Sequence, residues 1–530
     1  MAPRNVRVGI AGFVVFVAAF GLYLSTAPDW YSGDDLQYAS LIEEGVTGRP
    51  IYHPTGGRNQ YVGQRAVERT VPFNLRYALE MPTSVAVTRI EGRIRGEVDA
   101  LRAILVFRAL AGAVVVAFAF AILIRLGASF LVAAIGTAAV AFSAATWTYS
   151  THADQTITAI ALLVVGLYLG VRARSSRRPA VSVIVLAVCL GCAALYNLLA
   201  VVPASVILAG TVLALPVPTR GARIRAGAMG AAAFFVTFVG GLVVLSWRFD
   251  SVANLFSLDE WRATGFVGRP EYGLALHDDL VRAAYGFAES VLAYPNAHNP
   301  LAVEEWDKIV TLIAVASSVV LLARSRSNPQ TRWAVAVVGT WFTLCVFFNV
   351  WWDPGYAKYW VAPLVAWWLF VALSLAAFKE PGRRLAIAAA GIAVVVIACV
   401  NGATLWWPHR TPDTNQYLAA AKTLRASHSD ALFIAVDQSL GYSLDFYISY
   451  FTRRDVISTS LLAYGLGQPA ITSALRDRIR QHRSAGGPIY VYGLASASPE
   501  HTASVAAALP LDRLKPEWSF GWTTVMRLQE

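Results

Sequence analysis

Two adjacent aspartates follow the first long apolar stretch of the chain. Asp34 and Asp35 lie in the segment WYSGDDLQYA, which begins at Trp30. Ser32 and Asp35 have the spacing of a capping box, and acidic side chains favour the amino end of a helix. Capping accounts for one of the two carboxylates more readily than for both. A carboxylate at this position could accept a proton as a general base or bind a metal ion.

A third aspartate lies in a tight turn between two other apolar stretches. The turn reads YSTHADQT from Tyr149 to Thr156, with His152 and Asp154 near its centre. Such a short turn holds both side chains at the edge of the apolar region. Asp154 could cap the helix that follows it, or it could line a site between helices, and the spacing favours neither interpretation.

Three cations are candidates for binding a substrate anion. Lys358 is one of only five lysines, and it adjoins an apolar stretch after the aromatic segment WWDPGYAKYW. A lysine can bind a phosphate as a compact point charge, and Asp353 could pair with this one. His53 and Arg269 lie in long polar loops, where each is more typical of a solvated residue than of a ligand.

The sequence gives little support to a metal or nucleotide site. His277, Asp278 and Asp279 are adjacent and could hold a divalent cation, although they could also begin an amphipathic helix. A glycine-rich phosphate loop, an HExxH helix and a nucleophilic serine motif are all absent from the sequence, and the closely spaced Cys189 and Cys192 lie inside an apolar stretch, which is typical of small lipid- or core-facing residues and not of a zinc site. Use of a cytosolic nucleotide and zinc-dependent hydrolysis therefore have no support.

The composition indicates which elements must position these residues. Of 530 residues, 56% are hydrophobic and only 15% are charged, which excludes a soluble protein. Apolar stretches recur that could cross a hydrocarbon core of about 30 Å as helices. The eleven predicted spans are 8–26, 102–124, 129–149, 155–171, 180–195, 198–216, 227–247, 307–323, 333–350, 360–378 and 385–402. The first could instead be a cleaved signal peptide, and the fifth and sixth could form a re-entrant hairpin that turns near Asn197.

The basic residues predict how these spans are oriented. The short loops on one side hold 16 basic residues and one acid, whereas the other side holds 28 basic and 32 acidic residues. Positive charge favours the cytoplasmic side of a membrane. We therefore predict a multi-pass protein of the inner (plasma) membrane with its amino end in the cytoplasm. The net charge of +11 is an orientation signal and does not indicate a nucleic-acid partner.

Three predicted outer segments are large, namely residues 27–101, residues 248–306 and the tail after Asn401. In the tail, helices are expected at 414–426, 469–483 and 499–509, and strands at 431–436, 488–492 and 522–528. We predict a polytopic α-helical membrane domain, residues 1–402, followed by a soluble extracytoplasmic α/β domain, residues 403–530. Because the cytoplasmic loops are short, chemistry or recognition is expected on the outer face.

These features together resemble the GT-C superfamily of integral-membrane glycosyltransferases, and most closely its protein O-mannosyltransferase and lipid A aminoarabinose transferase branch. The segment GDDLQYA is similar to the catalytic acidic loop of that branch. The segment THADQTITAIALLVVGLYLGVRAR, from Thr151 to Arg174, is similar to its acidic turn, apolar span and basic end. The resemblance covers the membrane part of the chain, and it rests on topology as much as on these short motifs.

The resemblance implies transfer of a sugar from a polyprenyl-phosphate carrier to an acceptor hydroxyl on the outer face, with inversion at the anomeric carbon. Asp34 or Asp35 would be the catalytic base, and Asp154 would be a second acid that orients the acceptor or the base. Lys358 and Arg269 would bind the carrier phosphate. The physics of an inverting displacement agrees, because a base must face the incoming hydroxyl and cations must stabilise the departing phosphate.

Other parts of the mechanism are left open by the sequence. His152 stands where the branch more usually has a basic residue, and with His53 it completes the candidate substrate-binding set. The sugar is not named, the acceptor could be a glycan, a lipid or a protein, and a divalent cation could take part.

Two further classes of protein compete with this interpretation. A transporter or lipid flippase is the main alternative, but the middle of the spans holds almost no ionisable residue, and transport pathways usually carry intramembrane charge. A non-catalytic scaffold that displays the tail as a binding module is the third, although eleven spans exceed what anchoring requires.

Overall fold

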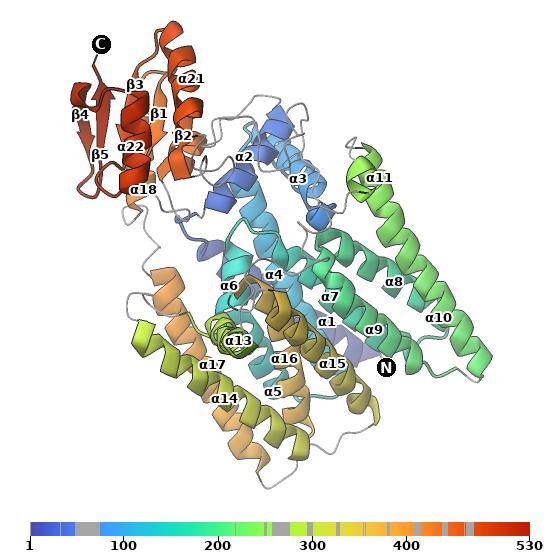
Figure 1. Ribbon diagram of the computed structural model, residues 1–530. Helices are drawn as coiled ribbons and strands as arrows, with labels where there is room; N and C mark the ends of the chain where they lie inside the picture. The colour runs from blue at the N-terminus through green and yellow to red at the C-terminus, as the bar shows by residue number, and fades with distance from the viewer. Residues whose placement is uncertain are drawn as a thin grey trace. The chain divides into compact units, whose positions relative to one another are not determined.

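The structure is a computed structural model that describes residues 2–31, 33–47, 75–217, 219–248, 252–256, 276–293, 300–324, 329–352, 355, 357–378, 382–407, 415–436, 444–460, 462 and 471–529. The chain forms two compact units (Figure 1). The first comprises residues 1–27, 73–83 and 105–408, and the second comprises residues 28–72, 84–104 and 409–530. The second unit therefore joins most of the first polar loop to the C-terminal tail.

The first unit is a bundle of helices (Figure 1). Its helices include α1 (Ala2–Ser25), α4 (Ala100–Arg125), α5 (Phe130–Phe142), α6 (Ala144–Thr151), α7 (Thr156–Ala173), α8 (Pro179–Tyr196), α9 (Val201–Leu213), α10 (Arg220–Phe235), α11 (Gly241–Arg248), α13 (Leu276–Val291), α14 (Pro300–Arg324), α15 (Pro329–Trp352), α16 (Ala357–Ala376) and α17 (Arg383–Asn401). Each of the eleven predicted spans coincides with one of these helices or with a consecutive pair of them.

Length and composition bear out a polytopic helical membrane protein. Among the described residues, eight helices are long and apolar enough to cross a membrane, or up to nine if the bent pair α5–α6 counts as one span. Two further apolar helices, Leu198–Leu213 and Ile309–Leu321, are shorter. The count of eleven spans stays a prediction, and so does the choice between two crossings and a re-entrant hairpin at α8–α9.

Helix α16 is surrounded by other helices and packs against α15, α5, α13, α6, α14 and α7. Its residues are apolar on every side, which is typical of a helix surrounded by other helices. A Cβ atom on Gly136 of α5 would lie 2.5 Å from the Cβ of Ala372, so the close approach of these two helices requires glycine. At the amino end of α16, next to Lys358, the Nδ2 group of Asn349 on α15 donates to the carbonyl of Tyr359 at 2.9 Å.

A sharp bend separates α5 from α6 and directs the chain into the turn that holds Asp154. The two helices meet at 60° around Ser143, whose backbone is extended. The Ser143 hydroxyl donates to the carbonyl of Ala139 at 2.6 Å and accepts from the indole of Trp368 at 2.7 Å. A buried serine thus satisfies polar groups at the break. Helix α6 ends at Thr151, three residues before Asp154.

One buried amide joins three helices of the bundle. Asn401, at the end of α17, is fully buried. Its Nδ2 group donates to the carbonyls of Phe142 at 2.6 Å and Val291 at 2.9 Å, and its Oδ1 atom accepts from the N–H of Ala293 at 2.8 Å. The residues it contacts lie at the ends of α5 and α13, where helices leave backbone groups without an intrahelical partner.

The second unit contains a five-stranded mixed sheet, shown in orange and red in Figure 1. Its strands are β1 (Leu432–Ala435), β2 (Asp455–Ser458), β3 (Ile489–Tyr492), β4 (Leu514–Ser519) and β5 (Thr524–Leu528), in the order β2-β1-β3-β5-β4. Strands β2, β1 and β3 are parallel, and β5 is antiparallel to both β3 and β4. The helices of this unit are α2 (Gly33–Thr47), α3 (Glu80–Arg95, whose first turn belongs to the first unit), α18 (Gln416–Leu424), α19 (Leu444–Tyr447), α21 (Ile471–Ser484) and α22 (Pro499–Ala508).

The alternation along the strands separates two faces of the sheet. Leu432 and Ile434 of β1 pack with Leu475 of α21 and Val505 of α22 in one apolar core. Phe433, which lies between the two β1 residues in sequence, stacks instead on Tyr490 of β3. This period of two is the pattern expected of strands with both faces covered. All three helices and all three strands expected in the tail are present, whereas β2, β4 and α19 were not foreseen.

Replacing the buried amide that joins α5, α13 and α17 should weaken the helical unit. We expect Asn401→Leu to lower the free energy of unfolding by about 2 kcal/mol, because two carbonyls and one N–H lose their partner. Thermal unfolding in detergent measures the change. Cys399→Leu, an exposed position on the same helix, is the control and should have little effect. Equal stability of both variants would contradict a structural role for Asn401.

Candidate functional site

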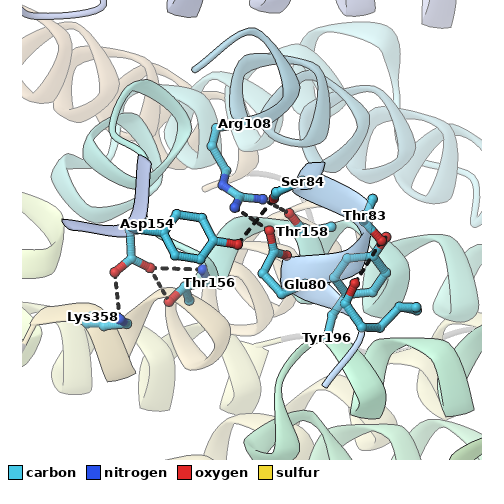
Figure 2. Close-up of polar contacts among 11 residues, drawn as sticks. Glu80, Thr83, Ser84, Arg108, Asp154, Thr156, Thr158, Tyr196 and Lys358 are labelled. Carbon is cyan, nitrogen blue, oxygen red and sulfur yellow. Dashed lines mark hydrogen bonds and ion pairs between the residues drawn. The ribbon is translucent and has the colours of Figure 1, made fainter. Parts of the chain in front are cut away.

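The carboxylate of Asp154 divides its two oxygens between a helix start and a cation. Its Oδ1 atom accepts from the N–H of Thr156 at 2.9 Å and from the Thr156 hydroxyl at 2.7 Å. Its Oδ2 atom lies 2.5 Å from Nζ of Lys358 (Figure 2). Asp154 therefore caps the start of α7 and also pairs with a cation on another helix, and its part in a functional site stays a prediction.

The ion pair lies in a largely dry environment. The side chains of Asp154 and Lys358 are only 15% and 12% exposed. Burial alone would raise the pKa of Asp154, but the charge of Lys358 and the hydrogen bonds from Lys358 and Thr156 outweigh it and leave the pKa below its usual value. Asp154 is therefore an anion at neutral pH. The predicted pairing of Lys358 with Asp353 concerns a residue outside the described residues.

Arg76 adds a second cation beside this pair. Arg76 lies in a short helical turn, Leu75–Tyr77. The central carbon of its guanidinium lies 5.3 Å from the ring centre of Tyr77 and 5.1 Å from the ring centre of Tyr359. It is hydrogen-bonded to the side chain of Tyr359 and lies within electrostatic reach of Asp154. Nζ of Lys358 also lies 5.5 Å from the ring centre of Tyr77. Two cations thus share one anion, which leaves a net positive site.

A small pocket of about 40 Å³ opens beside the amino end of α16. The polar part of its lining comes from Thr156, Asn197, Asn349, Lys358 and Tyr359. The rest is mostly apolar and comes from α7, α9, α15 and α16, and includes Ala159, Ile160, Leu163, Val202, Pro203, Phe348 and Ala362. A ligand with a charged head and an apolar body matches this distribution.

A second buried ion pair lies further along α7. Arg108 of α4 and Glu80 of α3 are both fully buried and form a short ion pair, and Nη1 of Arg108 donates to the hydroxyl of Thr158 at 2.6 Å (Figure 2). Thr83, three residues after Glu80, bonds the hydroxyl of Tyr196 at 2.9 Å. These contacts fix the start of α3 against α4, α7 and α8.

Sequence reasoning missed Arg76, Glu80 and Arg108. Arg108 lies inside the predicted span 102–124, as its seventh residue. Because a charged residue inside a span requires a partner, its position could have indicated a buried ion pair. Glu80 could not be identified as that partner because the two residues lie 28 positions apart. Arg76 carried no signal, since it lies in a polar segment with many other arginines.

The paired aspartates lie in the second unit, in the first turn of α2. Asp35 is 3% exposed, and Tyr31 lies within its electrostatic reach. The side chain of Asp34 falls outside the described residues. Tyr38, one turn further along α2, bonds the hydroxyl of Ser84 on α3 at 3.1 Å. The start of α2 is thus a buried position for an acid, and its chemical role stays a prediction.

For the remaining predicted site residues, the structure shows no hydrogen bond or ion pair with the Asp154–Lys358 pair among the residues that it describes. His152 ends α6, and its Nδ1 atom bonds the carbonyl of Thr148 at 2.9 Å, so this ring atom serves the local helix. His53 and Arg269 lie outside the described residues. Within the described ranges no group of three metal-ligating side chains occurs, and a divalent cation stays a prediction.

Solved structures share this architecture. The crystal structure of ArnT from Cupriavidus metallidurans bound to undecaprenyl phosphate matches with a TM-score of 0.58 at 13% identity, over 100% of this chain and 98% of that chain. ArnT is a GT-C glycosyltransferase. The chain has the GT-C fold.

A second group of structures agrees with the GT-C fold. The archaeal oligosaccharyltransferase AglB from Archaeoglobus fulgidus, in complex with an inhibitory peptide and a dolichol-phosphate, matches with a TM-score of 0.52 at 15% identity, over 91% of this chain and 69% of that chain. The same enzyme with zinc and sulfate matches with a TM-score of 0.52 at 15% identity, over 93% and 69%. No protein-family model and no curated protein sequence matches the chain.

Asp154 makes the free energy of unfolding depend on pH, and removing the charge of Lys358 should reverse the direction of that dependence. With Lys358 present, the lowered pKa stabilises the fold above about pH 4, and this contribution is lost as the pH falls through that lowered pKa. In Lys358→Met, burial would dominate and raise the pKa of Asp154, so the variant should lose stability relative to the natural protein as the pH rises from 4 to 7.

Unfolding temperatures measured across that pH range test the prediction. Lys358→Arg keeps the charge and is the matched control, which should follow the natural protein. A deficit of Lys358→Met that is constant with pH would show that the ion pair does not control the titration of Asp154.

Proposed function

We propose that the protein is a glycosyltransferase that moves a sugar from a polyprenyl-phosphate carrier to an acceptor hydroxyl on the extracytoplasmic face of the membrane. The observation that carries the proposal is the cluster of Lys358, Arg76 and Asp154 beside a mostly apolar pocket in a GT-C fold. A cation pair at a small, mostly apolar pocket suits a phosphate that is attached to an apolar chain. A nucleotide sugar offers no such chain.

The two cations would bind the carrier phosphate and stabilise it as it leaves. During transfer the bond between the anomeric carbon and the phosphate oxygen breaks, and negative charge grows on the phosphate. Lys358 and Arg76 can balance that charge, and the low exposure of the Asp154–Lys358 pair strengthens the interaction. Asp154 would hold Lys358 in place, and Arg269 and His53 are further candidates for the same anion.

One aspartate of α2 would act as the base. Asp34 or Asp35 would accept the proton of the acceptor hydroxyl while its oxygen attacks the anomeric carbon from the side opposite the phosphate, which inverts the configuration. The burial of Asp35 supports a base held away from bulk water. His152 is a further candidate contact for the acceptor or phosphate.

The ligands of the structural neighbours support the proposed donor. ArnT was solved with undecaprenyl phosphate, and AglB with a dolichol-phosphate. Both are polyprenyl phosphates. AglB has also been solved with zinc, and a divalent cation at the aspartates of α2 is compatible with the proposal. Loss of transfer in a chelator, with recovery on adding a divalent cation, would identify such a requirement.

The buried pair of Glu80 and Arg108 does not favour a transporter. Intramembrane charge marks transport pathways, but both of these side chains are fully buried and contact the neighbouring helices. The charge distribution supports an orientation with the amino end in the cytoplasm and the tail outside.

Neutralising the aspartates of α2 one at a time should identify the base. We expect either Asp34→Asn or Asp35→Asn to abolish sugar transfer in a purified assay with a polyprenyl-phosphate sugar, with expression and thermal unfolding little changed. Asp477→Asn, a 77% exposed acid in the second unit, is the control. Full activity in both single variants would refute the assignment.

Removing Arg76 should weaken use of the donor. We expect Arg76→Gln to lower kcat/KM for the polyprenyl-phosphate sugar about tenfold to a hundredfold, because a charge-assisted bond to phosphate is lost. Arg125→Gln, which removes an arginine bonded to Tyr168 at the end of α4, is the control and should retain activity. An unchanged kcat/KM for Arg76→Gln would exclude Arg76 from the phosphate site.

A further inference from the structure

One buried hydroxyl of the C-terminal tail is hydrogen-bonded to the backbone just before α2. Tyr447 of α19 is fully buried. Its hydroxyl oxygen accepts from the N–H of Tyr31 at 2.7 Å, and its O–H donates to the carbonyl of Tyr31 at 3.0 Å. Both backbone groups of one residue are thus satisfied by a single side chain 416 positions away.

Asn415 reinforces this contact. Its Nδ2 group donates to the Tyr447 hydroxyl at 3.1 Å and also to the backbone carbonyl of Asp29. Its Oδ1 atom accepts from the N–H of Leu418 at 2.9 Å, which makes it the N-cap of α18. Residues 29 and 31 are therefore tied to the start of a helix in the tail.

Aromatic rings enclose the same segment. Trp30 packs edge-on against Tyr417 at 5.9 Å, and Tyr31 contacts the rings of Tyr447 at 6.3 Å and Phe451 at 6.1 Å. Such pairs add to the stabilisation that comes from burial alone. Trp30 and Tyr31, which precede α2, are therefore held to the tail by ring contacts as well as by hydrogen bonds.

A second anchor lies eight residues beyond Asp35 on α2. Glu43 forms an ion pair with Arg453 at 2.5 Å and accepts from the hydroxyl of Tyr450 at 3.3 Å. Tyr450 also accepts from the N–H of Leu101, at the start of α4, at 3.3 Å. Eight residues span about 12 Å of helix, so the two anchors flank Asp35 from both directions.

The anchored tyrosine is close to the acid. Burial raises the pKa of Tyr31, and the negative charges of Asp29, Asp99 and Asp35 raise it further. Asp35 in the first turn of α2 therefore lies within electrostatic reach of the anchored Tyr31.

We propose that Tyr447 is a positioning residue for the catalytic base on α2, so that sugar transfer depends on the C-terminal tail. The inference rests on the proposed function, in which an aspartate of α2 is the base. It assigns a role to a domain that could otherwise serve as a separate binding module.

The variant Tyr447→Phe tests the proposal, because it removes the hydroxyl and keeps the ring. We expect kcat for sugar transfer to fall roughly tenfold to a hundredfold, with the KM for the polyprenyl-phosphate sugar within about twofold, since misplacing a reacting group affects the chemical step. Hydrogen exchange at the amide of Tyr31 should accelerate. Tyr490→Phe, which removes a hydroxyl from β3 and keeps the ring that stacks on Phe433, is the matched control and should leave both measurements unchanged.

Glu43→Gln is the second variant and covers the case in which Tyr447→Phe does not fold. It weakens the far anchor and should also lower kcat, to a smaller extent, without raising the donor KM. Accelerated exchange at Tyr31 with an unchanged kcat would overturn the positioning role and leave the proposed function standing. A rise in donor KM with constant kcat would also overturn it. If the natural protein transfers no sugar, the proposed function fails, and the hydrogen-exchange result still reports whether Tyr447 anchors the segment.

Discussion

A buried ion pair at the ends of two helices organises the candidate site. Asp154 begins α7 through Thr156 and holds Lys358 at the amino end of α16. Neither charge could remain in a nearly dry environment alone, because the cost of burying a single ion exceeds what packing returns. The pair therefore fixes the relative position of two helices and presents a cation beside an apolar pocket.

The same physical constraint recurs across the helical unit. Where water is excluded, a polar group must find a partner in the protein. Ser143 satisfies groups at the break between α5 and α6, Asn401 serves the ends of α5 and α13, and Arg108 pairs with Glu80. Ser143, Asn401 and Glu80 lie at a helix end or break, whereas Arg108 lies inside α4 and is paired there.

The second unit brings together two segments that lie far apart in the sequence. Residues 29–43 contact the tail through Tyr447, Asn415 and Arg453, and they belong to the same compact unit as the sheet. The sequence suggested a boundary near residue 402, with the first loop assigned to the membrane domain. The structure instead groups most of that loop with the tail, because their backbone and aromatic groups satisfy one another.

The sequence by itself determined the class of the protein, because membrane spans, strands and helix starts are local patterns of hydrophobicity and turn residues. Apolar stretches predicted the helices, short β-like runs predicted three of the five strands in the described sheet, and the isolated Asp154 and Lys358 stood out by type and position. Only the tertiary structure decided which residues meet. The partner of Lys358 proved to be Asp154, about 200 residues earlier, and Glu80, Arg76 and Tyr447 gained their roles through contacts between distant segments. Pairing across such separations depends on how helices pack, and a single sequence contains no local signal for it.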